Sequence, residues 1–193
     1  MTGRTPLEVL LVSDRHRSIV GLHLILRRDD GRILLMRRAN TGYQDGRLHL
    51  PSGHLEQAES VVDGVIREAQ EEVGVVVDPA DLRFVHVMHR AAETGHDRIG
   101  FFFTTDTWTG TVHNAEPAKC SEITWADPRD LPDDTIAYPA AGISHGLRGL
   151  ACSTFGYTAD RPIASLPHTS ANRSVAENPT LLNDVTAGGH VTA

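Results

Sequence analysis

The sequence has no long hydrophobic run, and none of its apolar stretches approaches the roughly 18 residues that a transmembrane helix needs. The first 17 residues contain only a short apolar segment, Leu7 to Val12, which Glu8 interrupts and no small-residue cleavage site follows. We therefore expect neither a membrane partner nor a secretory signal peptide. Cysteine is also scarce. Cys120 and Cys152 are too few for a disulfide framework, which favours a reducing cytoplasm as the location.

Positive charge is in short supply as well. Lys119 is the only lysine, and 18 lysines and arginines stand against 25 acids, for a net charge of −7. Because a nucleic-acid polymer is held through a basic surface, we do not expect one as a partner. The chain is 40% hydrophobic and 22% charged, so it can form a packed core, and wholesale disorder is excluded.

The pattern along the chain divides it into three parts. Residues 1–17 form a leader, and residues 18–150 carry the strand and helix patterns of one folded domain. Residues 151–193 are rich in Ala, Ser, Thr, Asn, Gly and Pro without a sustained period, which predicts a low-complexity, disordered tail.

Within the folded domain, two apolar runs between Ser18 and Arg38 are separated by the turn signal Asp29-Asp30-Gly31, which predicts a β-hairpin. Further strands are expected at 47–50, 75–77, 82–89, 99–105 and 122–125. Helical periodicity predicts helices at 60–73 and 137–150. Ser60 is the expected N-cap of the first helix, and Gly74 is the residue expected to end it.

The helix over 60–73 has an unusual charged face. It presents Arg67, Glu68, Glu71 and Glu72. Residues three and four apart are neighbours on a helix, so Glu68 lies beside Glu71 and Glu72. The ordinary interpretation is a solvated acidic face. Glu59 at the helix entrance, and Gly53 with a bare backbone carbonyl, favour instead a cluster of oxygen ligands for Mg²⁺ or Mn²⁺.

Residues 53–75, GHLEQAESVVDGVIREAQEEVGV, resemble the signature of the Nudix hydrolases. That signature is G, five residues, E, seven residues, then R-E-U-x-E-E-x-G-U, where U is aliphatic. Its seven fixed positions are filled by Gly53, Glu59, Arg67, Glu68, Glu71, Glu72 and Gly74. The lead-in LPSGHLEQAES has Ser52 and Ala58 where glycine is usual, which affects loop geometry rather than ligand side chains. The resemblance covers about residues 18–150.

The resemblance implies an α/β fold, the Nudix α/β/α sandwich, with a mixed β-sheet, the box helix on one side and the C-terminal helix on the other. It implies hydrolysis of a diphosphate linkage in a nucleoside diphosphate joined to a group X. Our first choice of substrate is a nucleoside triphosphate, oxidised or not, that gives monophosphate and pyrophosphate. ADP-ribose, a nucleotide sugar and a non-nucleotide diphosphate stay open. So does a catalytically silent nucleotide sensor, although such modules usually have broken boxes. Diphosphate isomerisation would need a catalytic cysteine.

The resemblance also implies roles for the box residues. Glu68, Glu71 and Glu72, with the Gly53 carbonyl, would bind the metal, and Arg67 would orient a glutamate. Glu59 would support the loop through Arg67, and a purely structural link between these two side chains is an equal alternative. The general base would be Glu71 or Glu72, or an acid from a later loop, for which Glu116 is the first candidate before Glu93 and Glu122.

Substrate contacts are expected outside the box. Arg37 or Arg38 would contact phosphate, and strand alternation predicts that only one of them faces the site. Asp133 and Asp134 precede the last helix, where they either cap it or, by resemblance to members that hydrolyse oxidised purine nucleotides, contact the base. We thus expect a small phosphorylated partner, first of all a nucleotide. Assembly is left open, with a homodimer as one option.

Overall fold

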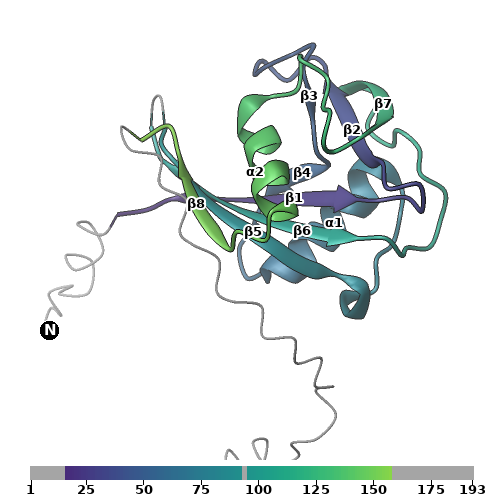
Figure 1. The fold of residues 1–193 in the computed structure, drawn as a ribbon, viewed down its shortest axis with the longest axis horizontal. Coiled ribbons are helices and arrows are strands. Elements are labelled where there is room, and N and C mark those ends of the chain that lie inside the picture. Colours follow the sequence, from purple (N-terminus) through teal and green to yellow (C-terminus); the bar gives the residue numbers. More distant parts are fainter. Residues whose placement is uncertain (1–15, 93–94, 158–193) are drawn as a thin grey trace, which may run out of the picture.

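Two β-sheets and two α-helices make up the part of the chain that the computed structural model describes, residues 16–92 and 95–157 (Figure 1). In chain order the elements are β1 (Ile19–Leu26), β2 (Ile33–Arg38), β3 (Leu48–His49), β4 (Ser52–His54), α1 (Val61–Val73), the 3₁₀-helix η1 (Pro79–Asp81), β5 (Arg83–Arg90), β6 (Arg98–Thr105), β7 (Cys120–Ala126), α2 (Ala137–Leu147) and β8 (Cys152–Phe155). Over these residues, no helix combines the length and the apolar character needed to cross a membrane.

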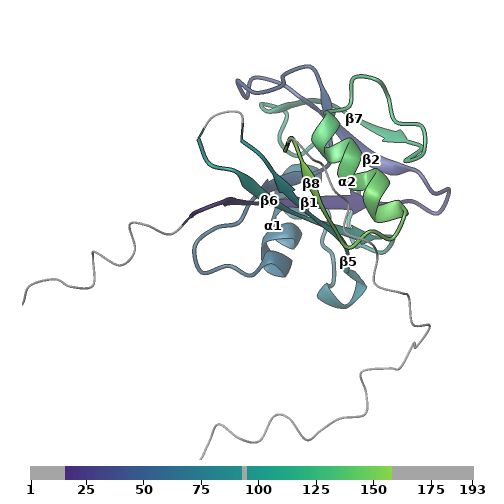
Figure 2. The same ribbon diagram turned by 60° about the vertical axis from the view of Figure 1, so that its left-hand side comes forward.

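The larger sheet is mixed and lies between the two helices. Its strand order is β4-β1-β6-β5-β8, with β1 parallel to β6, β5 parallel to β8, and the other pairs antiparallel. Phe103 packs in the apolar cluster that includes α1, whereas Phe102 packs in the cluster that includes α2. Figure 2 shows the helices on opposite faces of this sheet. The α/β/α sandwich that the sequence predicted is therefore confirmed.

The box helix begins and ends where the sequence predicted. The Ser60 hydroxyl accepts a hydrogen bond from the Asp63 backbone N–H at 3.1 Å and caps the first turn. Gly74 ends the helix with a φ of 71°, a left-handed conformation that glycine adopts without strain. The buried face of the helix, which includes Val65 and Ala69, packs on β1 and leaves the charged face free for chemistry.

The hairpin predicted between Ser18 and Arg38 is only partly present. A turn forms as expected, with the Gly31 N–H donating to the Arg28 carbonyl at 2.8 Å, but a single bridge, Arg27 to Ile33, joins the two strands. β1 pairs with β4 and β6, whereas β2 pairs with β3 and β7 in a second, three-stranded sheet. Both strands are largely buried, and each of them lies between two other strands of its own sheet.

The structure corrects one further strand prediction and the predicted start of the tail. The apolar run at 75–77 forms one isolated bridge, Val76 to Thr109, rather than a strand. Val75 and Val77 are buried because they pack in the α1 cluster, which explains the strand-like pattern. The predicted tail begins too early, because β8 at Cys152–Phe155 pairs with β5 and extends the folded unit past Leu150. Residues 1–15 and 158–193, the rest of the leader and tail, lie outside the described residues.

Two glycines of α2 offer a matched test of its packing on the sheet. A Cβ on Gly142 would overlap the Phe102 ring, whereas one on Gly146 would approach only Val85, at 3.3 Å. Alanine at either position gains about 1 kcal/mol of helix propensity. We expect Gly142→Ala to lower the free energy of unfolding by about 1–3 kcal/mol through overpacking. Gly146→Ala should stay within about 1 kcal/mol of the parent in urea unfolding. Equal effects would contradict this account of the interface.

Buried histidines predict a pH-dependent stability. His23 stacks on Phe102 with ring centroids 4.5 Å apart, and its Nε2 lies 3.2 Å from the Tyr138 hydroxyl. Burial lowers the pKa of His23 to about 3, and burial lowers that of His49 to about 4. Between these values and about 6.5, these two histidines bind more protons in the unfolded chain than in the folded one, so their contribution to stability falls as the pH drops.

The slope should reach at most about 1.4 kcal/mol per pH unit for each histidine. Urea unfolding between pH 7.5 and 4.5 measures it. His23→Phe should reduce the slope, and any difference from the parent near pH 7.5 then reports the lost contact alone, because both are neutral there. An unchanged slope would show that His23 titrates normally in the folded protein.

Candidate active site

Arg67 lies at the centre of the acidic cluster on α1. Its Nε and Nη2 donate to the two carboxylate oxygens of Glu59 at 2.8 and 3.2 Å, and Nη1 donates to Glu68 at 2.8 Å and to Glu71 at 3.1 Å. Nη2 also donates to the His54 carbonyl of β4 at 3.2 Å. Hydrogen bonding to Arg67 lowers the pKa of Glu59, and the same contact raises the pKa of Arg67. The predicted contact between Arg67 and Glu59 is thus present.

Gly53 brings the backbone of β4 against the helix. A Cβ at this position would overlap the carboxyl group of Glu68, so no other residue fits without displacing that side chain. The Glu68 side chain is largely buried, and burial raises its pKa, while the charge of Arg67 opposes the rise. The structure therefore places Gly53 and Glu68 side by side, as the box pattern implied.

Glu72 is the third carboxylate of the cluster. Its Oε2 accepts a hydrogen bond from the Ser52 backbone N–H at 2.7 Å. Burial first of all, and then the charges of Glu68 and Glu116, raise the pKa of Glu72 to about 8, although the Ser52 bond and the charge of Arg38 act in the opposite direction. Glu72 forms no ion pair with any residue that the structure describes. It is a partly buried acid that lacks a bound counter-charge.

A loop from the second half of the chain reaches this cluster. The Ala115 N–H donates to the Glu72 carbonyl at 3.0 Å, which docks the loop on the end of α1. Glu116 follows, and its charge raises the pKa of both Glu68 and Glu72. Lys119 bonds its carboxylate at 2.8 Å. Glu116 is thus brought to the cluster. Glu93, the alternative, lies outside the described residues.

The structure separates the two arginines at the end of β2. Arg37 donates to Glu122 at 2.8 Å, to the Gly46 carbonyl at 2.7 Å and to Asp134 at 2.5 Å, so its guanidinium is occupied by groups outside the box. Arg38 donates to the Tyr43 carbonyl at 2.8 Å, and it is close enough for its charge to lower the pKa of Glu72. The strand register shifts between Arg37 and Arg38, and of the two it is Arg38 whose charge reaches a box glutamate.

The two acids before α2 do not cap it. The N-cap of α2 is Ile136, and no side chain bonds the first turn, so the capping interpretation is wrong. Asp134 instead holds Arg37, and hydrogen bonding to Arg37 lowers the pKa of its carboxyl. Asp133 is exposed.

The donor set fits a hard divalent cation, although its side chains have not converged. No group of three His, Cys, Asp or Glu side chains within 16–92 and 95–157 already stands in a metal-binding arrangement. Arg67 holds Glu68 and Glu71, and Ser52 holds Glu72. All donors are oxygens, the ligand type that Mg²⁺ and Mn²⁺ prefer. The uncompensated Glu72 carboxylate and the missing Cβ of Gly53 both suit a cation between α1 and β4.

Two arginines that sequence reasoning missed lie beside the box strand. Arg98 Nη1 lies 2.7 Å from His54 Nε2, and Arg90 Nη2 donates to the Tyr43 hydroxyl at 3.0 Å. Both come from strand ends that meet only through the antiparallel register of β5 and β6. The pairing of the predicted strands 82–89 and 99–105 across their connecting loop could have indicated them.

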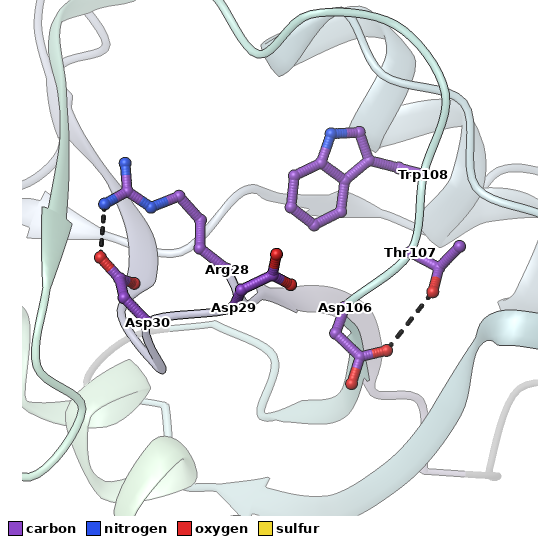
Figure 3. A pocket seen from close by; sticks show the side chains of 6 residues that line it. All are labelled: Arg28, Asp29, Asp30, Asp106, Thr107 and Trp108. Carbon is purple, nitrogen blue, oxygen red and sulfur yellow. Dashed lines mark hydrogen bonds and ion pairs between the residues drawn. The ribbon is translucent and has the colours of Figure 1, made fainter.

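A hollow elsewhere on the surface is unrelated to this cluster. Figure 3 shows its lining, with the Asp30 carboxylate bonded to the Arg28 guanidinium at 2.6 Å. It has a volume of about 550 Å³ and is lined by Arg28, Asp29, Asp30, Asp106, Thr107 and Trp108. None of these belongs to the box, so the hollow is no candidate for the active site.

Comparison with known proteins identifies the family. The model of the NUDIX domain family matches residues 16–145, and the chain therefore belongs to the Nudix hydrolases. The structure of a MutT NUDIX hydrolase from Burkholderia pseudomallei superposes with a TM-score of 0.61 at 24% identity, covering 67% of this chain and 98% of that one. At this identity the likeness supports the fold alone.

Of three similar proteins, two are named for a specific substrate. An uncharacterized Nudix hydrolase of Bacillus subtilis, YvcI, is 28% identical over 149 residues, 73% of this chain and 88% of that protein. The 8-oxo-dGTP diphosphatase of Escherichia coli is 37% identical over 110 residues, 56% and 83% of the two chains. The ADP-ribose pyrophosphatase of Methanocaldococcus jannaschii is 32% identical over 103 residues, 53% and 59%.

Gly53→Ala tests the contact between β4 and Glu68. The added Cβ would push the Glu68 carboxyl aside, and a misplacement of about 1 Å can lower a rate by about 10²-fold. We expect diphosphate hydrolysis to fall by that order while the far-UV circular dichroism is unchanged. Gly31→Ala is the control, because its φ of 84° makes it strained but no atom lies within 4 Å of the new Cβ. It should lose stability and keep activity. Full activity in Gly53→Ala would separate Glu68 from the site.

Proposed function

We propose that this protein hydrolyses a diphosphate linkage in a nucleoside diphosphate joined to a group X, with Mg²⁺ or Mn²⁺ as cofactor. The observation that carries this proposal is the placement of three carboxylates on one face of α1, where Arg67 bonds Glu68 and Glu71, the Ser52 N–H bonds Glu72, and the bare backbone of Gly53 lies against Glu68. Our first choice of substrate is a nucleoside triphosphate, ordinary or oxidised, which would give monophosphate and pyrophosphate. We place the protein in the cytoplasm and expect a small phosphorylated substrate rather than a nucleic acid.

The cofactor would be held by Glu68, Glu71, Glu72 and the Gly53 carbonyl. When bound, a divalent cation screens the charge of the diphosphate, polarises phosphorus and acidifies water. Arg67 keeps the mutually repelling carboxylates together, and Glu59 fixes Arg67 through two parallel bonds, a geometry that restricts the guanidinium to one plane. These two residues position the ligands rather than contact the substrate.

Proton acceptance from the attacking water falls to a carboxylate of this cluster. Glu71 and Glu72 are the candidates within the box, and Glu116 is the candidate from outside it. The position of Glu116 supports it as a candidate, because the hydrogen bond from the Ala115 N–H to the Glu72 carbonyl brings its loop to the carboxylates. Lys119 orients its side chain.

Phosphate binding by Arg38 agrees with its position. Its guanidinium lies 5.5 Å from the centre of the Tyr43 ring and its charge reaches Glu72, whereas Arg37 forms ion pairs with two acids. Of the predicted base contacts, Asp133 is the exposed one, and Asp134 acts through Arg37. ADP-ribose, a nucleotide sugar and a non-nucleotide diphosphate are the alternative substrates, and relatives named for 8-oxo-dGTP and for ADP-ribose support keeping both classes.

Glu72→Gln tests the proposal. The amide keeps an oxygen for the Ser52 N–H but loses the charge, so we expect the fold to persist and turnover to fall by orders of magnitude. The measurement is product analysis with Mg²⁺ on triphosphates including 8-oxo-dGTP, ADP-ribose, dinucleotides and nucleotide sugars. Glu56 is an exposed acid of the loop between β4 and α1, so Glu56→Gln removes the same charge outside the cluster and should retain the parent rate.

Activity of Glu72→Gln within a few-fold of the parent would overturn the ligand assignment. A parent protein that binds nucleotides but turns over no member of the panel would favour the silent sensor instead. Release of pyrophosphate from a triphosphate is the expected result.

A further inference from the structure

Arg90 and Arg98 form a pair of like charges on the sheet. They lie directly opposite each other in the antiparallel register of β5 and β6, on the face that α2 covers. Side chains at such positions are neighbours, and like charges there destabilise a sheet. The fold therefore holds two positive charges together, an arrangement that is unfavourable unless an anion binds between them.

No acid of the described chain neutralises this pair. The ion pairs among residues 16–92 and 95–157 involve neither Arg90 nor Arg98. Asp97 is adjacent in sequence, yet its carboxylate bonds His16 at 2.8 Å on one oxygen and His89 on the other. Arg83, on the same strand as Arg90, shows the contrast, because it pairs with Asp106 at 3.2 Å.

Neutral groups hold the two guanidiniums in place. Arg98 bonds His54, and Arg90 bonds the Tyr43 hydroxyl and lies 5.1 Å from the centre of the Tyr138 ring. Hydrogen bonds and ring contacts of this kind fix a guanidinium without cancelling its charge. Both side chains are partly buried, so water screens the charges only in part.

The pair is connected directly to the candidate active site. His54, the partner of Arg98, follows Gly53 on β4, and its carbonyl accepts a bond from Arg67. Tyr43, the partner of Arg90, also carries Arg38 over its ring. Among the described residues, none of these three arginines pairs with an acid: Arg98 bonds a side chain of β4, and Arg90 and Arg38 meet at Tyr43.

We propose that Arg90 and Arg98 bind a phosphate group at the far end of the substrate, so that the group X itself carries negative charge. This inference rests on the proposed hydrolysis of a diphosphate. A guanidinium binds phosphate oxygens through two parallel hydrogen bonds, and two opposed guanidiniums suit a dianionic terminal phosphate. A nucleoside triphosphate has such a terminal phosphate, whereas ADP-ribose and nucleotide sugars carry an uncharged sugar as X. Arg90 and Arg98 are then specificity-determining residues.

The first experiment compares substrates of the two kinds. Arg90→Gln and Arg98→Gln should raise KM for a nucleoside triphosphate about tenfold or more, since each removes a charge-assisted contact, and leave KM for a nucleotide sugar of the same base within about twofold. Arg83→Gln is the matched control, because it removes an arginine from the same strand that an acid already neutralises. It should change neither value. Equal increases for both substrates, or none, would overturn the inference.

The second experiment needs neither metal nor turnover. With EDTA present to remove divalent metal, tripolyphosphate should raise the melting temperature of the parent and of Arg83→Gln. Arg90→Gln and Arg98→Gln should not show this increase. If the two variants keep the shift, the inference fails. A protein that hydrolyses no diphosphate but shows the arginine-dependent shift would contradict the proposed function and support the anion site, so the two failures are distinguishable.

Discussion

The charge balance around Arg67 is the constraint on which the site depends. Glu68, Glu71 and Glu72 would repel one another on an isolated helix, and Glu59 adds a fourth acid at the same place. One guanidinium bonds three of these side chains and the backbone of β4 at once, so it joins the loop, the helix and the strand. The apolar face of α1 packs on β1, and this contact holds the helix in place. Arg67 can therefore orient the carboxylates while the core stabilises the fold.

The strand β4 divides the site into two electrostatic halves. Its α1 side carries the carboxylates, and Gly53 is the point where backbone and acid meet. On the other side, the His54 side chain bonds Arg98, which lies opposite Arg90 in the sheet. Although the net charge of the chain is −7, two arginines without an acidic partner among the described residues therefore lie close to β4, apart from the box carboxylates.

Local features could be predicted from the sequence, and features set by distant contacts could not. The box helix, its Ser60 cap and its Gly74 end follow from residues within a few positions of one another, and all three are confirmed. The split of β1 and β2 between two sheets, and the pairing of β8, depend on which strands come to lie beside them. The same holds for the site: the residues of the box lie within one segment, 53–75, whereas Arg90 meets Arg98 only through strand register.

The turn between β1 and β2 has a consequence for how the site is spaced. β1 carries the sheet to which the box belongs, and β2 carries the sheet from which Arg38 extends. Between them lies the apolar cluster that includes Ile25, Leu35 and Phe102. If the acids hold a cation and Arg38 holds a phosphate, as proposed, the thickness of this cluster sets the distance between the two groups. Side chains remote from any reacting atom would then set the length of the substrate that fits.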